Sequence, residues 1–161
     1  MPRPSLGSSE RIKVIIDTRE QLPYSFDDEK VEAVPKKLGA GDYSLEGYED
    51  RVAVERKTMD DFVNSVVHGR KRFYKELRKL AEYELACVVI EASLAEIHDG
   101  LYISAAHPNA VFGSAVSITV DFGVPVFFCS SRQLACRFTQ AFLIRAHRKL
   151  VNNEDKDKGA A

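Results

Sequence analysis

Glu55, Arg56 and Lys57 form a charged triplet that directly follows the apolar residues 52–54. The apolar residues predict a buried strand, and charges that extend such a strand lose hydration, which costs free energy unless they serve a purpose. Glu55 and Lys57 are two residues apart, so on a strand their side chains point to the same side. That side would carry a carboxylate for a metal ion with an ammonium group beside it.

Further carboxylates precede this triplet. Asp42 comes just before a short predicted strand, residues 43–45, which we expect to pair with the strand of the triplet. Asp17 and Glu20 end the first predicted strand, residues 13–16, and we expect them to reach the same pocket as metal ligands or as partners of basic side chains. A divalent metal held by carboxylates both activates water and stabilises the added negative charge in phosphodiester hydrolysis.

Asp42 and Glu55 are therefore the main predicted ligands of Mg²⁺ or Mn²⁺, because hard cations prefer oxygen ligands and Mg²⁺ keeps several of its waters. Lys57 would orient the attacking water or offset charge in the transition state. Taken alone, Glu55 and Lys57 would be read as an ordinary solvated strand end with salt bridges. Asp42 and Asp17 make the metal site the preferred interpretation.

Two predicted helices follow the triplet. Thr58 and Asp61 predict a capping box at the start of the first helix, and capping alone explains Asp61 as well as a role in orienting Lys57 does. The second helix is predicted at residues 71–84 and overlaps a segment, 68–79, that holds six Lys or Arg residues and one Glu. Such a run is usually a solvated helix face, but this one lies close to the candidate site. We therefore predict a surface for DNA phosphates, made of Arg70, Lys71, Arg72, Lys75 and Arg78.

Strands and helices alternate along the chain, which predicts an α/β fold with a mixed central sheet flanked by helices. Of the 161 residues, we assign 11–151 to one domain, 1–10 to a disordered N-terminal tail and 152–161 to a disordered C-terminal tail. Residues 21–35 are predicted to be mainly loop. Ser130 and Gln133 predict the capping box of the last helix, and its predicted buried face is Leu134, Phe138, Ala141 and Phe142.

Composition excludes several classes of protein. The net charge is -1, so any DNA binding must come from local patches. The three cysteines have no Cys-x-x-Cys spacing, which indicates reduced thiols in a cytoplasmic protein and argues against a zinc site. The sequence contains no apolar run long enough to cross a membrane and no Walker-type motif, so we expect neither a membrane segment nor a nucleotide cofactor.

Together, Gly41-Asp42, Glu55-Arg56-Lys57 and Asp61 resemble the GD…ERKxxxD signature of the XPF-type structure-specific endonucleases. Residues 16–20 resemble the opening motif of that family, and Ser65 with Gly69-Arg70 resembles the segment after the signature. The resemblance covers residues 12–150. It implies a restriction-endonuclease-like three-layer fold, dependence on Mg²⁺ or Mn²⁺, and cleavage of branched DNA near single-strand/double-strand junctions such as flaps and forks, in DNA repair or recombination.

The resemblance also assigns roles to individual residues. It implies that the active site contains Asp17, Asp42, Glu55 and Lys57, and we place Arg56 in the same catalytic group. The supporting residues that it implies are Arg19, Glu20, Asp61 and Arg70.

This sequence departs from the family in one respect. Family members usually carry tandem helix-hairpin-helix repeats after the nuclease domain, and this sequence has no room for them. We therefore expect either an excised domain, nuclear if its source is eukaryotic, or a free-standing member that forms a homodimer or uses a separate DNA-binding partner. Phe138 and Phe142 are a candidate dimer face, although a position in the protein core is the preferred interpretation of both. Two other functions remain open: a Holliday-junction resolvase-like nuclease on the same fold, and a non-catalytic DNA-binding or scaffold module.

Overall fold

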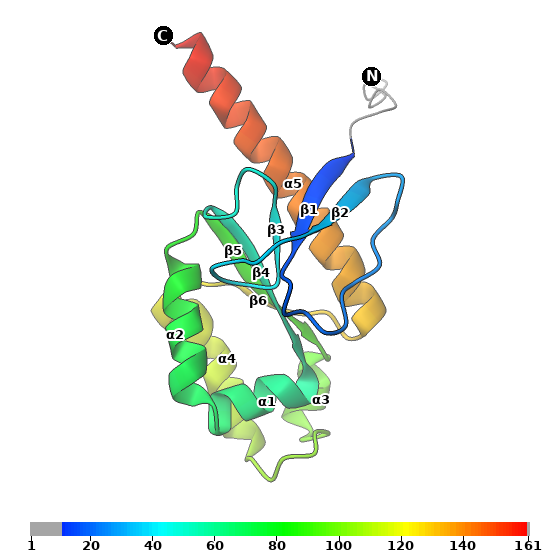
Figure 1. The fold of residues 1–161 in the computed structure, drawn as a ribbon. Helices are drawn as coiled ribbons and strands as arrows, with labels where there is room; N and C mark the ends of the chain where they lie inside the picture. The colour runs from blue at the N-terminus through cyan, green and yellow to red at the C-terminus, as the bar shows by residue number, and fades with distance from the viewer. Residues whose placement is uncertain (1–10, 161) are drawn as a thin grey trace, which may run out of the picture.

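The computed structural model describes residues 11–160, and its centre is a six-stranded mixed sheet (Figure 1). The strand order is β2-β1-β3-β4-β5-β6. β1 and β2 are parallel, β3 is antiparallel to both of its neighbours, and β4, β5 and β6 are parallel. The strands are β1 (Ile12–Ile16), β2 (Val31–Pro35), β3 (Tyr43–Leu45), β4 (Val52–Thr58), β5 (Leu85–Glu91) and β6 (Val126–Phe128).

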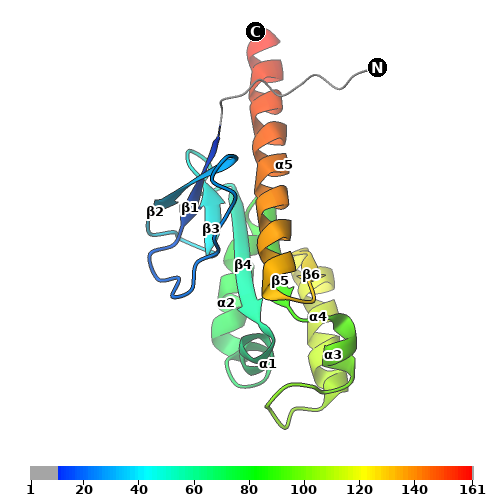
Figure 2. The ribbon, with the colours of Figure 1, turned by 90° about the vertical axis from the view of Figure 1, so that its right-hand side faces the viewer.

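Helices cover both faces of this sheet, as Figure 2 shows for α5 on one side and α1 with α2 on the other. The helices are α1 (Met59–Val67), α2 (Arg70–Ala81), α3 (Leu94–His98), α4 (Pro108–Phe122) and α5 (Arg132–Gly159). Side chains alternate along β5: Val88 and Ile90 pack with α1, α2 and α4, whereas Cys87 and Val89 pack with α5. This double burial explains the continuous apolar run of β5 and confirms the predicted three-layer α/β fold.

The edge strand β2 was not predicted, because residues 21–35 were assigned to loop. Val31 is buried, but Ala33 and Pro35 are exposed and the other two residues are half-buried, so the apolar signal is weak. Within residues 11–160, β2 pairs with β1 alone, and proline is tolerated on such an edge.

Two further predictions, both about helix α5, were wrong. The helix continues to Gly159, past the predicted boundary at residue 151, and Glu154 in this extension bonds Tyr48 (3.1 Å) and Arg51 (3.5 Å). Ser131 rather than Ser130 caps the helix, by accepting a hydrogen bond from the Leu134 amide. The predicted N-terminal tail, 1–10, lies outside the described residues.

The buried face of α5 also differs from the predicted one. Leu134 is 50% exposed, and the Phe138 ring packs on Phe127 with 4.5 Å between centroids, at the side of the helix. Small residues such as Ala135 and Ala146 face the sheet and let the helix approach closely. Among residues 11–160, no helix is both long enough and apolar enough to span a membrane.

Candidate active site

A close crossing of two chain segments places Asp42 next to the β4 triplet. Gly41 has a φ of +75°, and a Cβ at this position would lie 3.1 Å from the Ala53 Cβ and 3.2 Å from the Val54 carbonyl oxygen. The Asp42 amide donates to that carbonyl (2.8 Å), and the Asp42 carbonyl accepts from the Asp17 amide (2.9 Å). Glycine therefore lets the chain pass close enough to β4 to set Asp42 between the ends of β1 and β4.

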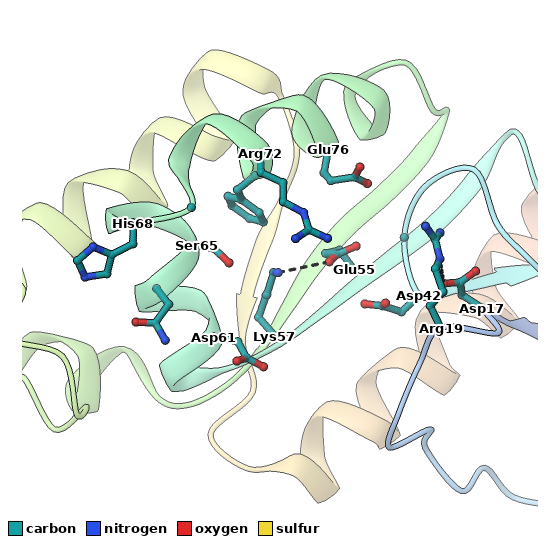
Figure 3. Close-up of a pocket in the computed structure, with 14 residues that line it drawn as sticks. Asp17, Arg19, Asp42, Glu55, Lys57, Asp61, Ser65, His68, Arg72 and Glu76 are labelled. Atoms are coloured by element: carbon teal, nitrogen blue, oxygen red, sulfur yellow. Dashed lines mark hydrogen bonds and ion pairs between the residues drawn. The ribbon is translucent and has the colours of Figure 1, made fainter.

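Most of the predicted site residues line one cavity of about 660 Å³, shown in Figure 3. Its floor is formed by the ends of β1 and β4, and its opposite wall by α1 and α2. The predicted residues that line it are Asp17, Arg19, Asp42, Glu55, Lys57, Asp61 and Arg72. A smaller cavity of about 280 Å³ shares Asp42, Glu55 and Lys57 with it and adds Glu20 and Arg56.

Glu55 and Asp42 are two carboxylates in a poorly solvated position. Burial, together with the nearby Asp42 carboxylate, raises the pKa of Glu55 to about 8. Burial likewise raises the pKa of Asp42 to about 6, against the hydrogen bond that its Oδ2 accepts from the Arg56 amide (2.7 Å). Two adjacent carboxylates that resist ionisation form a site that a cation would stabilise.

Lys57 is held between a charge and a ring. Its Nζ lies 3.7 Å from the Glu55 Oε1 and 5.0 Å from the centroid of the Phe73 ring, over the ring face. Its side chain is 19% exposed. The strand geometry thus places the ammonium and the Glu55 carboxylate on one side of β4, as the two-residue spacing predicted.

Asp17 uses both of its carboxylate oxygens within the protein. Oδ1 accepts from the Leu38 amide (2.8 Å) and Oδ2 from Arg19 Nε (2.9 Å), and the side chain is 3% exposed. Of the two roles predicted for Asp17, the structure displays the holding of a basic side chain. Its role as a metal ligand stays a prediction.

The Arg56 side chain points away from the larger cavity. Its guanidinium bonds Glu20 (3.0 Å) and Glu91 (2.8 Å), and Arg132 also approaches Glu91 (3.6 Å). All three members of the Glu20–Arg56–Glu91 chain are at most 10% exposed in their side chains. Arg56 is therefore placed to fix the strand, and its membership of the catalytic group stays a prediction. Sequence reasoning did not identify Glu91 or Arg132, which lie far along the chain from Arg56.

The remaining predicted residues lie on α1 and α2. The Thr58 hydroxyl accepts from the Asp61 amide (3.1 Å), which confirms Thr58 as the N-cap. Among the described residues the Asp61 carboxylate does not return the bond that a capping box needs, and it lines both cavities instead. Arg70 stacks on Tyr74 and bonds its hydroxyl (2.9 Å). The structure does not bring Lys71, Lys75, Arg78 or Arg70 into the cavity, whereas Arg72 lines it.

Four lining residues had been given no role in the site. Asn64 and His68 lie on and just after α1, and Phe73 and Glu76 lie on α2. Phe73 also belongs to the hydrophobic core, where it is 4% exposed. For Glu76 the signal was present, because it follows Arg72 by four residues and so shares its side of the helix.

The donor set fits a divalent cation that keeps water ligands. Within residues 11–160, no three His, Cys, Asp or Glu side chains gather closely enough to enclose a metal ion. Mg²⁺ usually binds through one or two carboxylates together with water and substrate phosphate oxygens. Asp42 and Glu55, with their raised pKa values, provide such a pair.

The raised pKa values predict how stability depends on pH. A carboxyl group whose pKa is higher in the folded than in the unfolded state destabilises the fold as pH rises from the unfolded value to the folded one. For Glu55 this window runs from its ordinary value of 4.5 to about 8. Without metal, we therefore expect Glu55→Gln to raise the Tm by about 3 °C or more at pH 8, and to leave it nearly unchanged at pH 5.

Thermal unfolding in EDTA at both pH values measures this effect. At pH 8, saturating Mg²⁺ should narrow or reverse the difference in Tm between Glu55→Gln and the wild type, because the cation stabilises the native state to which it binds. A variant that is less stable than the wild type at pH 8 in EDTA would contradict the assignment of Glu55 as a strained carboxylate.

Comparisons with known proteins cover most of the chain. Residues 16–142 match the ERCC4 domain family. The chain is 36% identical over 122 residues to a protein of Methanocaldococcus jannaschii named as an ATP-dependent RNA helicase. It is 29% identical over 126 residues to the 3′-flap repair endonuclease Xpf of Saccharolobus solfataricus. Each alignment covers 76% of this chain, but 14% and 50% of those two proteins, so the chain spans half of their length or less.

Two solved structures of XPF from Aeropyrum pernix resemble the fold. The one without DNA has a TM-score of 0.66 and covers 89% of this chain and 69% of the solved chain. The complex with DNA has a TM-score of 0.67 and covers 86% and 66%. Both are 22% identical in sequence, and they confirm the predicted restriction-endonuclease-like fold.

Proposed function

Because this chain belongs to the ERCC4 domain family, as its signature predicted, we propose that it is a metal-dependent DNA endonuclease. Its substrate would be branched DNA, cut near single-strand/double-strand junctions such as flaps or forks during repair or recombination. The observation that carries the proposal is the pair Asp42 and Glu55, two carboxylates with raised pKa values beside Lys57 in an open cavity. The flap endonuclease of S. solfataricus, a relative of this chain, supports the choice of substrate.

The metal requirement belongs to this proposal. When bound, Mg²⁺ or Mn²⁺ would polarise the phosphate and lower the pKa of water. Asp42 and Glu55 would hold the cation, and its charge would keep both carboxylates ionised at neutral pH. Lys57, fixed by Glu55 and Phe73, would stand where it can orient the attacking water or offset the negative charge of the transition state. Water would attack phosphorus and the O3′ atom would leave with a proton, which gives a 5′-phosphate and a 3′-hydroxyl.

The supporting residues would position this group. Asp17 fixes Arg19, whose Nη2 also donates to the Leu38 carbonyl (3.0 Å), and so presents its guanidinium at the cavity for a phosphate. Asp61 lies at the start of α1, where its carboxylate faces the positive end of the helix and the cavity. Arg72 lines the cavity from α2 and would contact the scissile strand.

The exposed face of α2 would bind the DNA backbone. Lys71, Lys75 and Arg78 share this face, are exposed, and form no ion pair with the residues that the structure describes. Replacing all three with glutamine should weaken binding and flatten the plot of log affinity against log salt by about 2 to 3 in slope, because each phosphate contact releases about 0.9 counterions.

Fluorescence anisotropy with a labelled fork at several salt concentrations measures that slope. The matched control replaces Lys13, Lys30 and Lys36 with glutamine and so removes the same amount of charge. These three lysines are already paired with Glu46, Asp27 and Glu49. Equal slopes for the two triple variants would show that α2 is not the DNA surface.

Helix α4 supports the proposal that the chain pairs with a second protein chain. Phe112, Val116 and Val120 form an apolar stripe on its outer side and are 38%, 51% and 73% exposed. Phe138 and Phe142, the dimer face predicted from the sequence, are instead half-buried beside the α5 core. A homodimer through α4 is therefore favoured over one through α5. Light scattering of the wild type and of Val116→Asp with Val120→Asp tests it, with a fall from dimer mass to monomer mass expected.

A panel of labelled substrates tests the function as a whole. Forks, 3′-flaps, four-way junctions and plain duplex are incubated with the chain in Mg²⁺, in Mn²⁺ and in EDTA. We expect metal-dependent nicking of forks or flaps and little cutting of plain duplex. Preferred symmetric cutting of four-way junctions would indicate a resolvase-like nuclease, and binding without cutting in either metal would indicate a non-catalytic module.

A further inference from the structure

The loop after β1, residues 20–24, borders the smaller cavity and presents an aliphatic side chain there. We call this loop the rim. Leu22 is 65% exposed and, among the described residues that line this cavity, it is the one aliphatic side chain. The other lining residues include Asp42, Glu55 and Lys57, so the cavity is part of the candidate active site. Single exposed aliphatic residues are ordinary on protein surfaces, but this one lies within the site.

Arg132 fixes the backbone of the rim through hydrogen bonds to its carbonyl groups. Its Nη2 donates to the carbonyls of Leu22 (2.7 Å) and Pro23 (3.2 Å), and its guanidinium lies over the Tyr24 ring, 4.9 Å from the centroid. Nη1 lies 3.6 Å from Glu91, which holds the guanidinium in place. A side chain from the first residue of α5 thus fixes a loop more than a hundred residues earlier in the sequence.

The two ends of the rim are also held. On one side Glu20 bonds Arg56 (3.0 Å). On the other, the Tyr24 amide donates to the Tyr43 hydroxyl (2.8 Å), and the two rings stack at 5.2 Å. Tyr24 is buried, at 4% exposure, whereas Leu22, two residues earlier, points outward. The rim is therefore a pre-organised loop, and the exposure of Leu22 does not result from loose packing.

A rigid aliphatic group beside a phosphate-cutting site suits the apolar surface of a nucleotide. The charged surroundings, with Arg19, Glu20 and Lys57 in the same cavity, make a poor site for an apolar protein surface. The faces of bases and sugars are apolar, while the phosphate between them would bind the polar residues. A loop fixed before binding also loses little conformational entropy when it makes such a contact.

We propose that Leu22 contacts the base or sugar of the nucleotide that flanks the scissile phosphate, and that Arg132 positions it for this contact. The inference rests on the proposed nuclease function, and it adds a specificity-determining residue outside the family signature. Arg132 touches no substrate in this arrangement; it acts through the carbonyls of Leu22 and Pro23.

Leu22→Ser tests the contact, with Ile103→Ser as the matched control. Ile103 is 92% exposed and does not line either cavity. We expect Leu22→Ser to raise the KM for a labelled fork about tenfold, with kcat within about twofold, since part of an apolar contact is lost. Ile103→Ser should change neither value. An unchanged KM for Leu22→Ser would overturn the proposal.

A second readout does not require cleavage. Forks that carry 2-aminopurine in turn on each side of the cut site are bound by Glu55→Gln, with and without Leu22→Ser. Leu22 should change the fluorescence at one flanking position, and Leu22→Ser should abolish that change while anisotropy still reports a bound fork. If the wild type cuts no DNA, the proposed function fails, but this binding experiment still reports on Leu22. A fluorescence change that is the same in Glu55→Gln with and without Leu22→Ser would overturn the proposed contact.

The positioning role of Arg132 is tested by comparing the single variants of Arg132 and Leu22 with the double variant. Arg132→Lys keeps a charge near Glu91 but lacks the planar fork that reaches two carbonyls. We expect it to raise KM about as much as Leu22→Ser does, with an unchanged Tm, and the double variant to be no worse than either single variant. Additive defects, or an Arg132→Lys that binds as well as wild type, would show that Arg132 does not act through the rim. A change in solution mass for Leu22→Ser would assign the side chain to a chain–chain contact and overturn the proposal.

Discussion

Glu55→Gln should lower the rate of DNA cleavage at least about 10³-fold, because the variant loses half of the predicted metal-binding pair and metal chemistry supplies the nucleophile and the charge stabilisation. Glutamine keeps the size of the side chain and removes only its charge. The Glu55 pKa of about 8 shows that the protein environment opposes this charge, so a bound cation would be needed to maintain it. Single-turnover cleavage of a labelled fork in saturating Mg²⁺ measures the rate.

Two variants complete this experiment. Asp42→Asn should cause a similar loss, and the double variant should be little worse than either single one, since both residues would act through the same cation. Glu82→Gln, at the exposed end of α2, removes the same charge outside the cavity and should leave the rate unchanged. Full activity of Glu55→Gln, in a variant that unfolds as cooperatively as the wild type, would remove Glu55 from the mechanism.

Lys57→Met should lower kcat about 10²-fold, within the range for the loss of one group that stabilises transition-state charge. Methionine retains most of the apolar stem, so packing on Phe73 is largely kept. The KM should change little, because Lys57 would act on charge that develops during the reaction and not on the bound substrate. Steady-state cleavage of a fork over a range of DNA concentrations separates kcat from KM.

Lys57→Arg makes the test more specific. A guanidinium keeps the charge but is larger and planar, and it would not fit the space between Glu55 and the Phe73 ring in the same way, so we expect partial rescue at most. Lys13→Met, on the exposed side of β1, serves as the control for loss of a lysine. A Lys57→Met variant with wild-type kcat would show that the ammonium has a structural role only.

Local patterns predicted the parts of the fold whose signals are local. The apolar run that begins β4 and the Thr58 cap each depend on neighbouring residues, and both were predicted. β2 was missed because an edge strand of five residues that ends in Pro35 depends on its pairing with β1. The end of α5 was missed because residues 152–159 are polar, while Glu154 is held by Tyr48 and Arg51 from another part of the chain.

In the candidate site, too, features that depend on neighbouring residues were predicted and those that depend on distant parts of the chain were not. The spacing of Glu55 and Lys57 on one strand predicted that their side chains share a side, and the structure places them there. Glu20 was predicted as a possible partner of a basic side chain, and it pairs with Arg56. Glu91 could not be predicted, because it reaches Arg56 through the pairing of β4 with β5, and Arg132 reaches Glu91 through the packing of α5. Asp17 shows why residue type alone is insufficient: a carboxylate beside the proposed metal-binding pair can have both oxygens occupied by protein donors.

Whether Asp42 and Glu55 together hold a divalent cation is measured most directly by titration of the metal-free chain with Mn²⁺ at pH 8, followed by electron paramagnetic resonance of the free ion. The wild type should bind Mn²⁺ in the presence of a non-cleavable fork, with protons released on binding. Asp42→Asn combined with Glu55→Gln should abolish that binding, while Glu82→Gln should retain it. Equal Mn²⁺ binding by the wild type and the double variant would contradict the metal site, and with it the proposed mechanism.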